Sequence, residues 1–194
     1  MDLSKGEKLL LIMLCDLYQQ LSIRSDIDPQ IVKNAIVNDQ TWGIEWEYSG
    51  LLGSEGGPFP PIVKEVGDIL DMWSFIKESY AQISSAEKCN LQILSGDLCE
   101  ISADKMVFPG FDFDAEQEHY IVAKFFISQL GMFPALHSDS LNACTPVLKG
   151  HKRMMDVFTP MRAKVSGRLL NAAELLEIFK SQELLAEQED LKVG

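Results

Sequence analysis

The chain has 194 residues, of which 46% are hydrophobic and 24% charged, a composition typical of a globular protein and not of a disordered one. Its 29 acidic residues exceed its 17 lysines and arginines, and the resulting net charge of −12 disfavours binding to nucleic acid and to anionic membranes. No apolar stretch reaches the ~20 residues needed to cross a bilayer, and the cysteines form no C-x-x-C pair, so we expect a cytoplasmic protein without a zinc or redox motif.

The first fifty residues predict three helices. Residues 4–23 begin with a Ser4–Glu7 capping box and carry one apolar face, which we expect to be buried. That face consists of Leu10, Leu14, Leu17 and Leu21. Asp28–Pro29 predicts the cap and first turn of a second helix, to about residue 38, and Thr41 is expected to cap a short third one. Glycines and prolines between 50 and 61 then indicate a loop without phosphate-binding spacing.

Helical spacing continues through the middle of the chain. Residues 60–83 predict a helix of about six turns. A break at Ser84–Ser85 precedes a further helix through Leu94, with Ser85 and Lys88 around its start. Residues 101–108 are the only segment that we expect to be extended.

The last eighty residues predict three more helices. Residues 115–130 form the first, which Gly131 ends, and Thr145–Pro146 opens the second, which Pro160 ends. Asn171 and Glu174 cap the third. The predicted fold is therefore all-α and multihelical, with about eight helices in two loosely divided subdomains. These are residues 1–84, which include the Gly/Pro loop 53–61, and residues 85–194, which end in a polar tail.

The densest stretch of the chain, residues 105–126, is open to two interpretations. In the structural one, Asp112 or Asp114 caps a helix, Glu116 and Glu118 lie in its first turns, and aromatic side chains reach into the core. Those aromatics are Phe111, Phe113 and Tyr120. In the other, Phe111, Asp112, Glu116 and His119 form a recognition loop on a rigid scaffold.

Neither metal binding nor catalysis is predicted. Glu116 and His119 have the Glu-x-x-His spacing of di-iron bundles, but such a site needs that motif twice, and neither His137 nor His151 has a glutamate three residues before it. Cys144 lies between these two histidines, and Asp139 could orient either ring, yet proximity along the chain is not proximity in space. We therefore assign no catalytic residue, metal or cofactor.

Two groups of residues are candidates for binding. Trp42 and Trp46 lie four residues apart on one helix face, beside the Gly/Pro loop. Residues 149–168 contain six basic side chains against one acidic side chain, Asp156. The six are Lys149, Lys152, Arg153, Arg162, Lys164 and Arg168. They form either a solvated face that pairs with acids or a contact for anions.

Several stretches resemble the YfbU family of bacterial proteins. The resemblance rests on residues 107–133 (VFPGFDFDAEQEHYIVAKFFISQLGMF), residues 141–158 (LNACTPVLKGHKRMMDVF) and residues 169–179 (LLNAAELLEIF). It is most specific over 105–179, and the Gly/Pro stretch and the tail after Ser181 look like additions to a shorter core. The resemblance implies a multihelical fold in two parts and self-association, but no catalytic residues.

The leading hypothesis is a non-enzymatic helical protein-interaction module that self-associates and binds a protein partner of unknown identity. The alternative is an effector or hydrolase-like enzyme that acts on nucleic acid or a small anion through residues 149–168, with His119 or His151 as general base. A helix-turn-helix regulator is a weaker third option, because the net charge opposes DNA binding.

Overall fold

The computed structural model describes residues 3–53, 59–95, 101–102, 105–137 and 139–182. Within these ranges the chain is all-α, as predicted, with nine α-helices and four strands of two residues each. The polar tail predicted after residue 181 lies almost entirely outside the described residues.

The first two helices begin where the sequence predicts. Helix α1 (Lys5–Gln20) starts behind Ser4, whose hydroxyl accepts the Glu7 N–H while the Glu7 carboxylate accepts the Ser4 N–H, so the capping box is confirmed. Helix α2 (Pro29–Val37) starts behind Asp28, whose side chain accepts a backbone N–H of the first turn at 2.8 Å.

Two short helices replace the single one expected after residue 41. They are α3 (Trp42–Glu47) and α4 (Ser49–Leu52), and Tyr48 separates them with a φ of −109° and a ψ of 26°. Thr41 occupies the N-cap position of α3, as predicted, but its side chain makes no capping hydrogen bond. Helix α4 ends at Gly53 in the left-handed conformation, and most of the predicted Gly/Pro loop lies outside the described residues.

Helix α5 (Pro61–Gln82) is the long helix predicted for residues 60–83. Helix α6 (Ser85–Ser95) follows, but its cap is one residue earlier than predicted. The Ser84 hydroxyl accepts the Glu87 N–H at 3.3 Å, and the Glu87 carboxylate accepts the Ser84 N–H at 2.9 Å. Ser84 and Glu87 therefore form the capping box, because only glutamate can supply the reciprocal acceptor.

Two pairs of short strands interrupt the helices. Strand β1 (Ile101–Ser102) pairs antiparallel with β2 (Lys105–Met106), within the segment expected to be extended. Strand β3 (Phe111–Asp112) pairs parallel with β4 (Asn142–Ala143), with Phe111 opposite Asn142. The second pair was not predicted, because two residues are too few to display alternation along a strand.

The helix predicted for residues 115–130 is present in two forms. Residues Gln117–Lys124 form α7, and Phe125–Gln129 continue it as the π-helix η2. Gly131 follows with a φ of 64°, which confirms the predicted stop. A short 3₁₀ turn, η3 (Pro134–Leu136), then leads towards the last two helices.

The last two helices are α8 (Leu148–Lys164) and α9 (Ala172–Ser181). The Asn171–Glu174 capping box of α9 is confirmed. Two predictions about α8 are wrong: it starts after Val147 and not at a Thr–Pro cap, and Pro160 lies inside it. The helix continues past Pro160, with Phe158 buried before the proline and the partly buried Met161 packed against the core after it.

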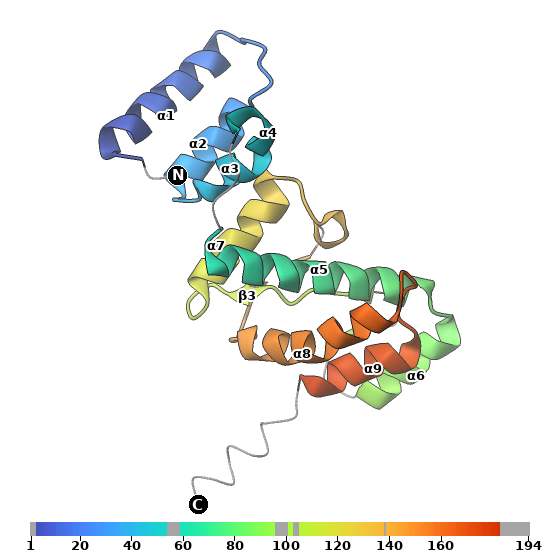
Figure 1. Cartoon of the computed structure of the whole chain (residues 1–194). Coiled ribbons are helices and arrows are strands. Elements are labelled where there is room, and N and C mark those ends of the chain that lie inside the picture. The colour runs from blue at the N-terminus through green and yellow to red at the C-terminus, as the bar shows by residue number, and fades with distance from the viewer. Residues whose placement is uncertain (1–2, 54–58, 96–100, 103–104, 138, 183–194) are drawn as a thin grey trace, which may run out of the picture.

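Among the described residues, one cluster of buried hydrophobic side chains extends from Ala35 of α2 to Phe179 of α9. Helices α1 to α4 lie at one end of the molecule, α5 crosses its middle, and α6, α8 and α9 gather at the other end (Figure 1). Helix α5 contacts α7, α8, α9 and η3, and its buried side chains join one cluster with those of the C-terminal helices. The division of the chain near Ser84 therefore stays a prediction, and α5 packs mainly on the C-terminal side of it.

Candidate protein-binding surface

Helix α1 presents an apolar face to solvent. Six large apolar side chains along it have exposed fractions between 49% and 68%. They are Leu9, Leu10, Met13, Leu14, Leu17 and Leu21, and we call them the α1 face. The expectation that four of these leucines are buried is wrong. Contiguous exposed apolar side chains of this kind typically mark a contact surface for another molecule.

The opposite side of α1 attaches the helix to the protein. Leu11 and Ile12 pack against the core, and Cys15 is buried. Burial, followed by the nearby Asp16 carboxylate, raises the pKa of the Cys15 thiol, so this cysteine is a neutral packing residue. Helix α1 is therefore apolar on two sides, and only one side is used for folding.

Polar contacts hold α1 along its length against α2. Two ion pairs and one amide–amide hydrogen bond join the two segments. The pairs are Lys8 with Asp39, Asp16 with Lys33 and Gln19 with Gln30. Figure 1 shows α1 beside α2 at the edge of the molecule, with its other side unpartnered by the described helices. The α1 face is thus presented on an anchored helix.

A hollow of about 270 Å³ adjoins the α1 face, between α1, α2 and the α3–α4 pair. Its walls are almost entirely apolar. Leu14 belongs both to the α1 face and to this wall, and Tyr18 lines it from the same helix. Ile44 and Leu52 line the hollow from α3 and α4. An apolar side chain of a bound partner would fit into this hollow beside the α1 face.

The two predicted tryptophans are packing residues of α3. Trp42 is buried, with ring centroids 5.4 Å from Phe125 and 4.8 Å from Phe126 of η2. Trp46 lies edge-to-face with Trp42 at 6.2 Å and is 36% exposed. The predicted shared face is therefore present, and it joins α3 to the end of the α7–η2 helix.

The predicted recognition loop is tied down by hydrogen bonds. The Asp112 carboxylate accepts the N–H groups of Asp114 and Ala115 at 2.8 and 2.9 Å, so Asp112 caps the turn before α7. Glu116 is 8% exposed, and its carboxylate accepts the N–H groups of Asp112 at 3.0 Å and Leu148 at 2.7 Å. Both carboxylates thus bind the backbone, but the prediction that Asp112 or Asp114 caps the helix is wrong, because α7 begins after Glu116 without a side-chain cap.

The aromatic residues of that stretch divide between core and surface. Phe111 is fully buried, as predicted, with its ring 5.6 Å from that of His119. Phe113 is 43% exposed and lies edge-to-face on Tyr120, so its predicted burial is wrong. Phe113 lies beyond the end of β3, in the turn that the Asp112 carboxylate holds, so the strand does not direct its side chain into the core.

His119 faces a glutamate that sequence reasoning missed. Its Nε2 lies 3.7 Å from Glu65 Oε1 of α5, and the same oxygen lies 2.6 Å from Lys152 Nζ of α8. Nothing in the local pattern of α5 marks Glu65, because only tertiary packing brings the three helices together. In the part of the chain that the structure describes, no three His, Cys, Asp or Glu side chains are grouped to hold a metal ion.

His151 is a neutral core residue of α8. It is fully buried, its Nδ1 accepts the Trp73 indole N–H at 3.1 Å, and its Nε2 lies 3.0 Å from the Gly110 carbonyl oxygen. The indole can only donate, so Nε2 carries the proton. Burial is the main cause that lowers the pKa of this imidazole. With both nitrogens engaged, the ring has no free site for a reactant.

Two residues of the possible Cys-His-Asp arrangement, His137 and Asp139, have other contacts. Nε2 of the exposed His137 lies 2.9 Å from the Met132 carbonyl oxygen. Asp139 accepts the Lys77 ammonium at 2.5 Å and the Phe108 N–H at 3.0 Å. Cys144 is an exposed free thiol.

Four of the six basic residues of 149–168 are engaged within the molecule. Lys152 pairs with Glu65, Arg153 donates to the Gln182 carbonyl oxygen, and the Arg162 guanidinium lies 3.6 Å over the Phe75 ring. Lys149 and Lys164 have exposed side chains. The segment is therefore largely a set of internal contacts, in agreement with the pairing interpretation.

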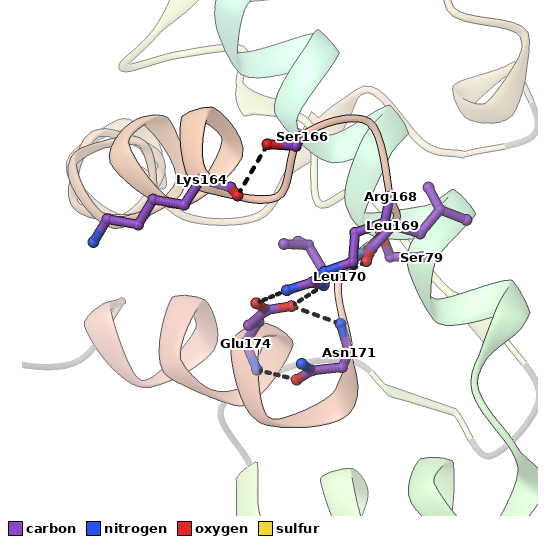
Figure 2. A network of polar contacts seen from close by, with 8 residues as sticks. All are labelled: Ser79, Lys164, Ser166, Arg168, Leu169, Leu170, Asn171 and Glu174. Carbon is purple, nitrogen blue, oxygen red and sulfur yellow. Dashed lines mark hydrogen bonds and ion pairs between the residues drawn. The ribbon is translucent and has the colours of Figure 1, made fainter.

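Arg168 makes the fourth contact, with α9 (Figure 2). Its guanidinium donates to both Glu174 oxygens, at 2.8 and 2.6 Å, and the same carboxylate accepts the Asn171 N–H at 2.9 Å. These hydrogen bonds, Arg168 first, lower the pKa of Glu174. Beside this network the Leu170 N–H donates to the buried Ser79 hydroxyl of α5 at 3.1 Å. The network fastens the α8–α9 connection and leaves the arginine little freedom to bind an anion.

These features define a class: an all-helical protein with one hydrophobic core and a solvent-exposed apolar helix at its edge. The chain belongs to the YfbU family, because the model of the YfbU domain matches residues 1–181. The match confirms the resemblance and extends it beyond residues 105–179 to the N-terminal helices. No curated protein and no solved structure matches the chain. None of the described helices is both long and apolar enough to span a bilayer.

Proposed function

We propose that this chain is a non-enzymatic helical protein-interaction module that self-associates through the α1 face. The exposure of six large apolar side chains on one anchored helix is the observation that carries the proposal. Completing the burial of each leucine would contribute about 1 kcal/mol, so the face as a whole is costly to leave in water. A partner that covers it removes this cost.

A protein fits this face better than a membrane does. Helices that lie on anionic membranes carry lysines and arginines on their polar side. The two lysines of α1 are balanced by Glu7 and Asp16, Lys8 is paired with Asp39, and the chain has a net charge of −12. A cytoplasmic location accords with Cys15, Cys89 and Cys144, which are free cysteines.

The enzyme alternative has less support. The basic segment 149–168 is mostly engaged in internal contacts, and His151 uses both ring nitrogens inside the core. His119 lies near the carboxylate of Glu65, but the same carboxylate also pairs with the ammonium group of Lys152 and neutralises its charge. No observation favours this alternative over the apolar surface.

Sedimentation velocity on variants tests the proposal. The double variant Leu10→Glu/Leu17→Glu places two charges on the α1 face without touching the core, so its fold should survive and its circular dichroism should match the native protein. The native chain should sediment as an oligomer at micromolar concentration, and the double variant as a monomer. Ile93→Glu, which changes an equally exposed apolar residue of α6, is the control and should remain oligomeric. Equal oligomerisation by the native chain and the double variant would overturn the role of α1.

A further inference from the structure

We propose that two copies of this chain pair through their α1 faces in antiparallel orientation, with a two-fold axis that passes between Met13 and Leu14. This inference rests on the proposed self-association and specifies its geometry. The partner of the α1 face is then a second α1 helix. The reason lies in the order of exposed side chains along the helix.

A two-fold interface has a strict requirement. If residue i of one copy contacts residue j of the other, then j of the first contacts i of the second. In an antiparallel helix pair, the facing residues have numbers with a constant sum. A face that is suited to this arrangement therefore has the same character on both sides of its midpoint.

The α1 face meets this requirement about a midpoint between Met13 and Leu14. Residues whose numbers add to 27 face each other in this register, which sets Leu10 against Leu17 and Met13 against Leu14. Each of these four side chains is about half exposed or more. Two such copies would enclose an apolar centre two turns long.

The ends of the face fit the same register. Leu21, which is 67% exposed, would lie over Gly6, and no heavy atom lies within 4 Å of the position where a Cβ of Gly6 would be. A large side chain at one end is therefore matched by free space at the other.

The helix dipoles favour the antiparallel orientation over the parallel one. Antiparallel packing sets the positive end of each α1 helix beside the negative end of the other.

Disulfide trapping tests this geometry on the full chain. Cys15, Cys89, Cys99 and Cys144 are first replaced by serine or alanine, and Leu10→Cys or Leu17→Cys is then added separately. In the proposed pair Leu10 faces Leu17, while two Leu10 positions lie about 10 Å apart along the helix axis. An equimolar mixture of the two variants should therefore form a covalent dimer several-fold faster under mild oxidation than either variant alone.

Three other outcomes have distinct meanings. Rapid dimerisation of each variant alone, with no gain on mixing, would overturn the proposal in favour of parallel pairing. The oligomer could be lost in Leu10→Glu/Leu17→Glu while no sample forms a disulfide. That result would overturn the proposed antiparallel register and leave self-association through α1 intact. A strict monomer of the cysteine-free chain and of the native chain would contradict both.

Discussion

The carboxylate of Glu116 accepts the backbone N–H of Leu148 at 2.7 Å, and so caps the first turn of α8 from the start of α7, 32 residues away in the chain. Its second oxygen accepts the Asp112 N–H at 3.0 Å. One buried side chain thus holds together the turn before α7 and the N-terminus of α8. This relationship accounts for the Glu-x-x-His stretch as scaffold.

Replacement of this carboxylate should destabilise the fold. We expect Glu116→Ala to lower the free energy of unfolding by about 1–3 kcal/mol, because two partly buried N–H groups lose their acceptor. Urea denaturation followed by circular dichroism measures the change. Glu118→Ala, at an exposed site in the first turn of α7, is the matched control and should change the free energy of unfolding by less than about 0.5 kcal/mol. Equal effects of the two substitutions would contradict the capping role.

His151 should make stability depend on pH. Because burial lowers the pKa of this imidazole, the unfolded chain binds its proton more readily than the folded chain does. The contribution of His151 to stability is therefore complete above its unfolded pKa of about 6.5 and declines as pH falls, by up to about 1.4 kcal/mol per pH unit.

Thermal unfolding between pH 5 and pH 7.5, roughly the range in which histidine titrates, measures this dependence. The variant His151→Gln, which cannot titrate, should show a flatter profile than the native protein. A native slope in His151→Gln would place the pH dependence elsewhere.

Replacement of two glycines of the N-terminal helices by alanine should have opposite effects on the free energy of unfolding. A Cβ on Gly43 would lie 2.2 Å from Phe125 Cε1, so Gly43→Ala should cost about 1–3 kcal/mol as the Trp42–Phe125 packing shifts. Around Gly50 no heavy atom lies within 4 Å of the Cβ position, so Gly50→Ala should be neutral or stabilise by up to about 1 kcal/mol. Differential scanning calorimetry distinguishes the two. A neutral Gly43→Ala would mean that α3 does not approach η2 so closely.

The basic residues of 149–168 should not bind nucleic acid. Four of the six are engaged internally, so fluorescence anisotropy of a short labelled single-stranded DNA should not change on addition of the protein, even at low salt. Saturable binding of the DNA that weakens steeply with added salt would instead support the enzyme or effector alternative. The variant Lys149→Glu/Lys164→Glu should then abolish this binding.

Local signals predicted the helices better than their burial. The capping boxes at Ser4 and Asn171 depend on residues three apart, so the sequence alone is enough to locate them. Four leucines on one side of α1 predict that this side is buried, whereas the structure exposes it. Yet residues 9–14 are all apolar, and six consecutive apolar residues cannot fit a single stripe of a helix. That run was the available signal of a second, solvent-exposed face.

Other features depend on contacts between distant segments. The start of α8 is set by Glu116, which no pattern near Val147 reveals. Helix α8 continues through Pro160, where the packing of Phe158 and Met161 against the core offsets the lost hydrogen bond. Glu65 meets His119 and Lys152 only once three helices have packed. The sequence therefore predicts the helices and the candidate residues. The residues that these candidates contact can be identified only from the folded structure.

The most direct test of the central claim is the mass of the native chain in solution, measured by light scattering coupled to size exclusion over a range of micromolar concentrations. Self-association through the α1 face predicts a mass that rises above 21.7 kDa towards about twice that value, because an isologous face closes at two copies. A constant mass of 21.7 kDa at every concentration would contradict the claim.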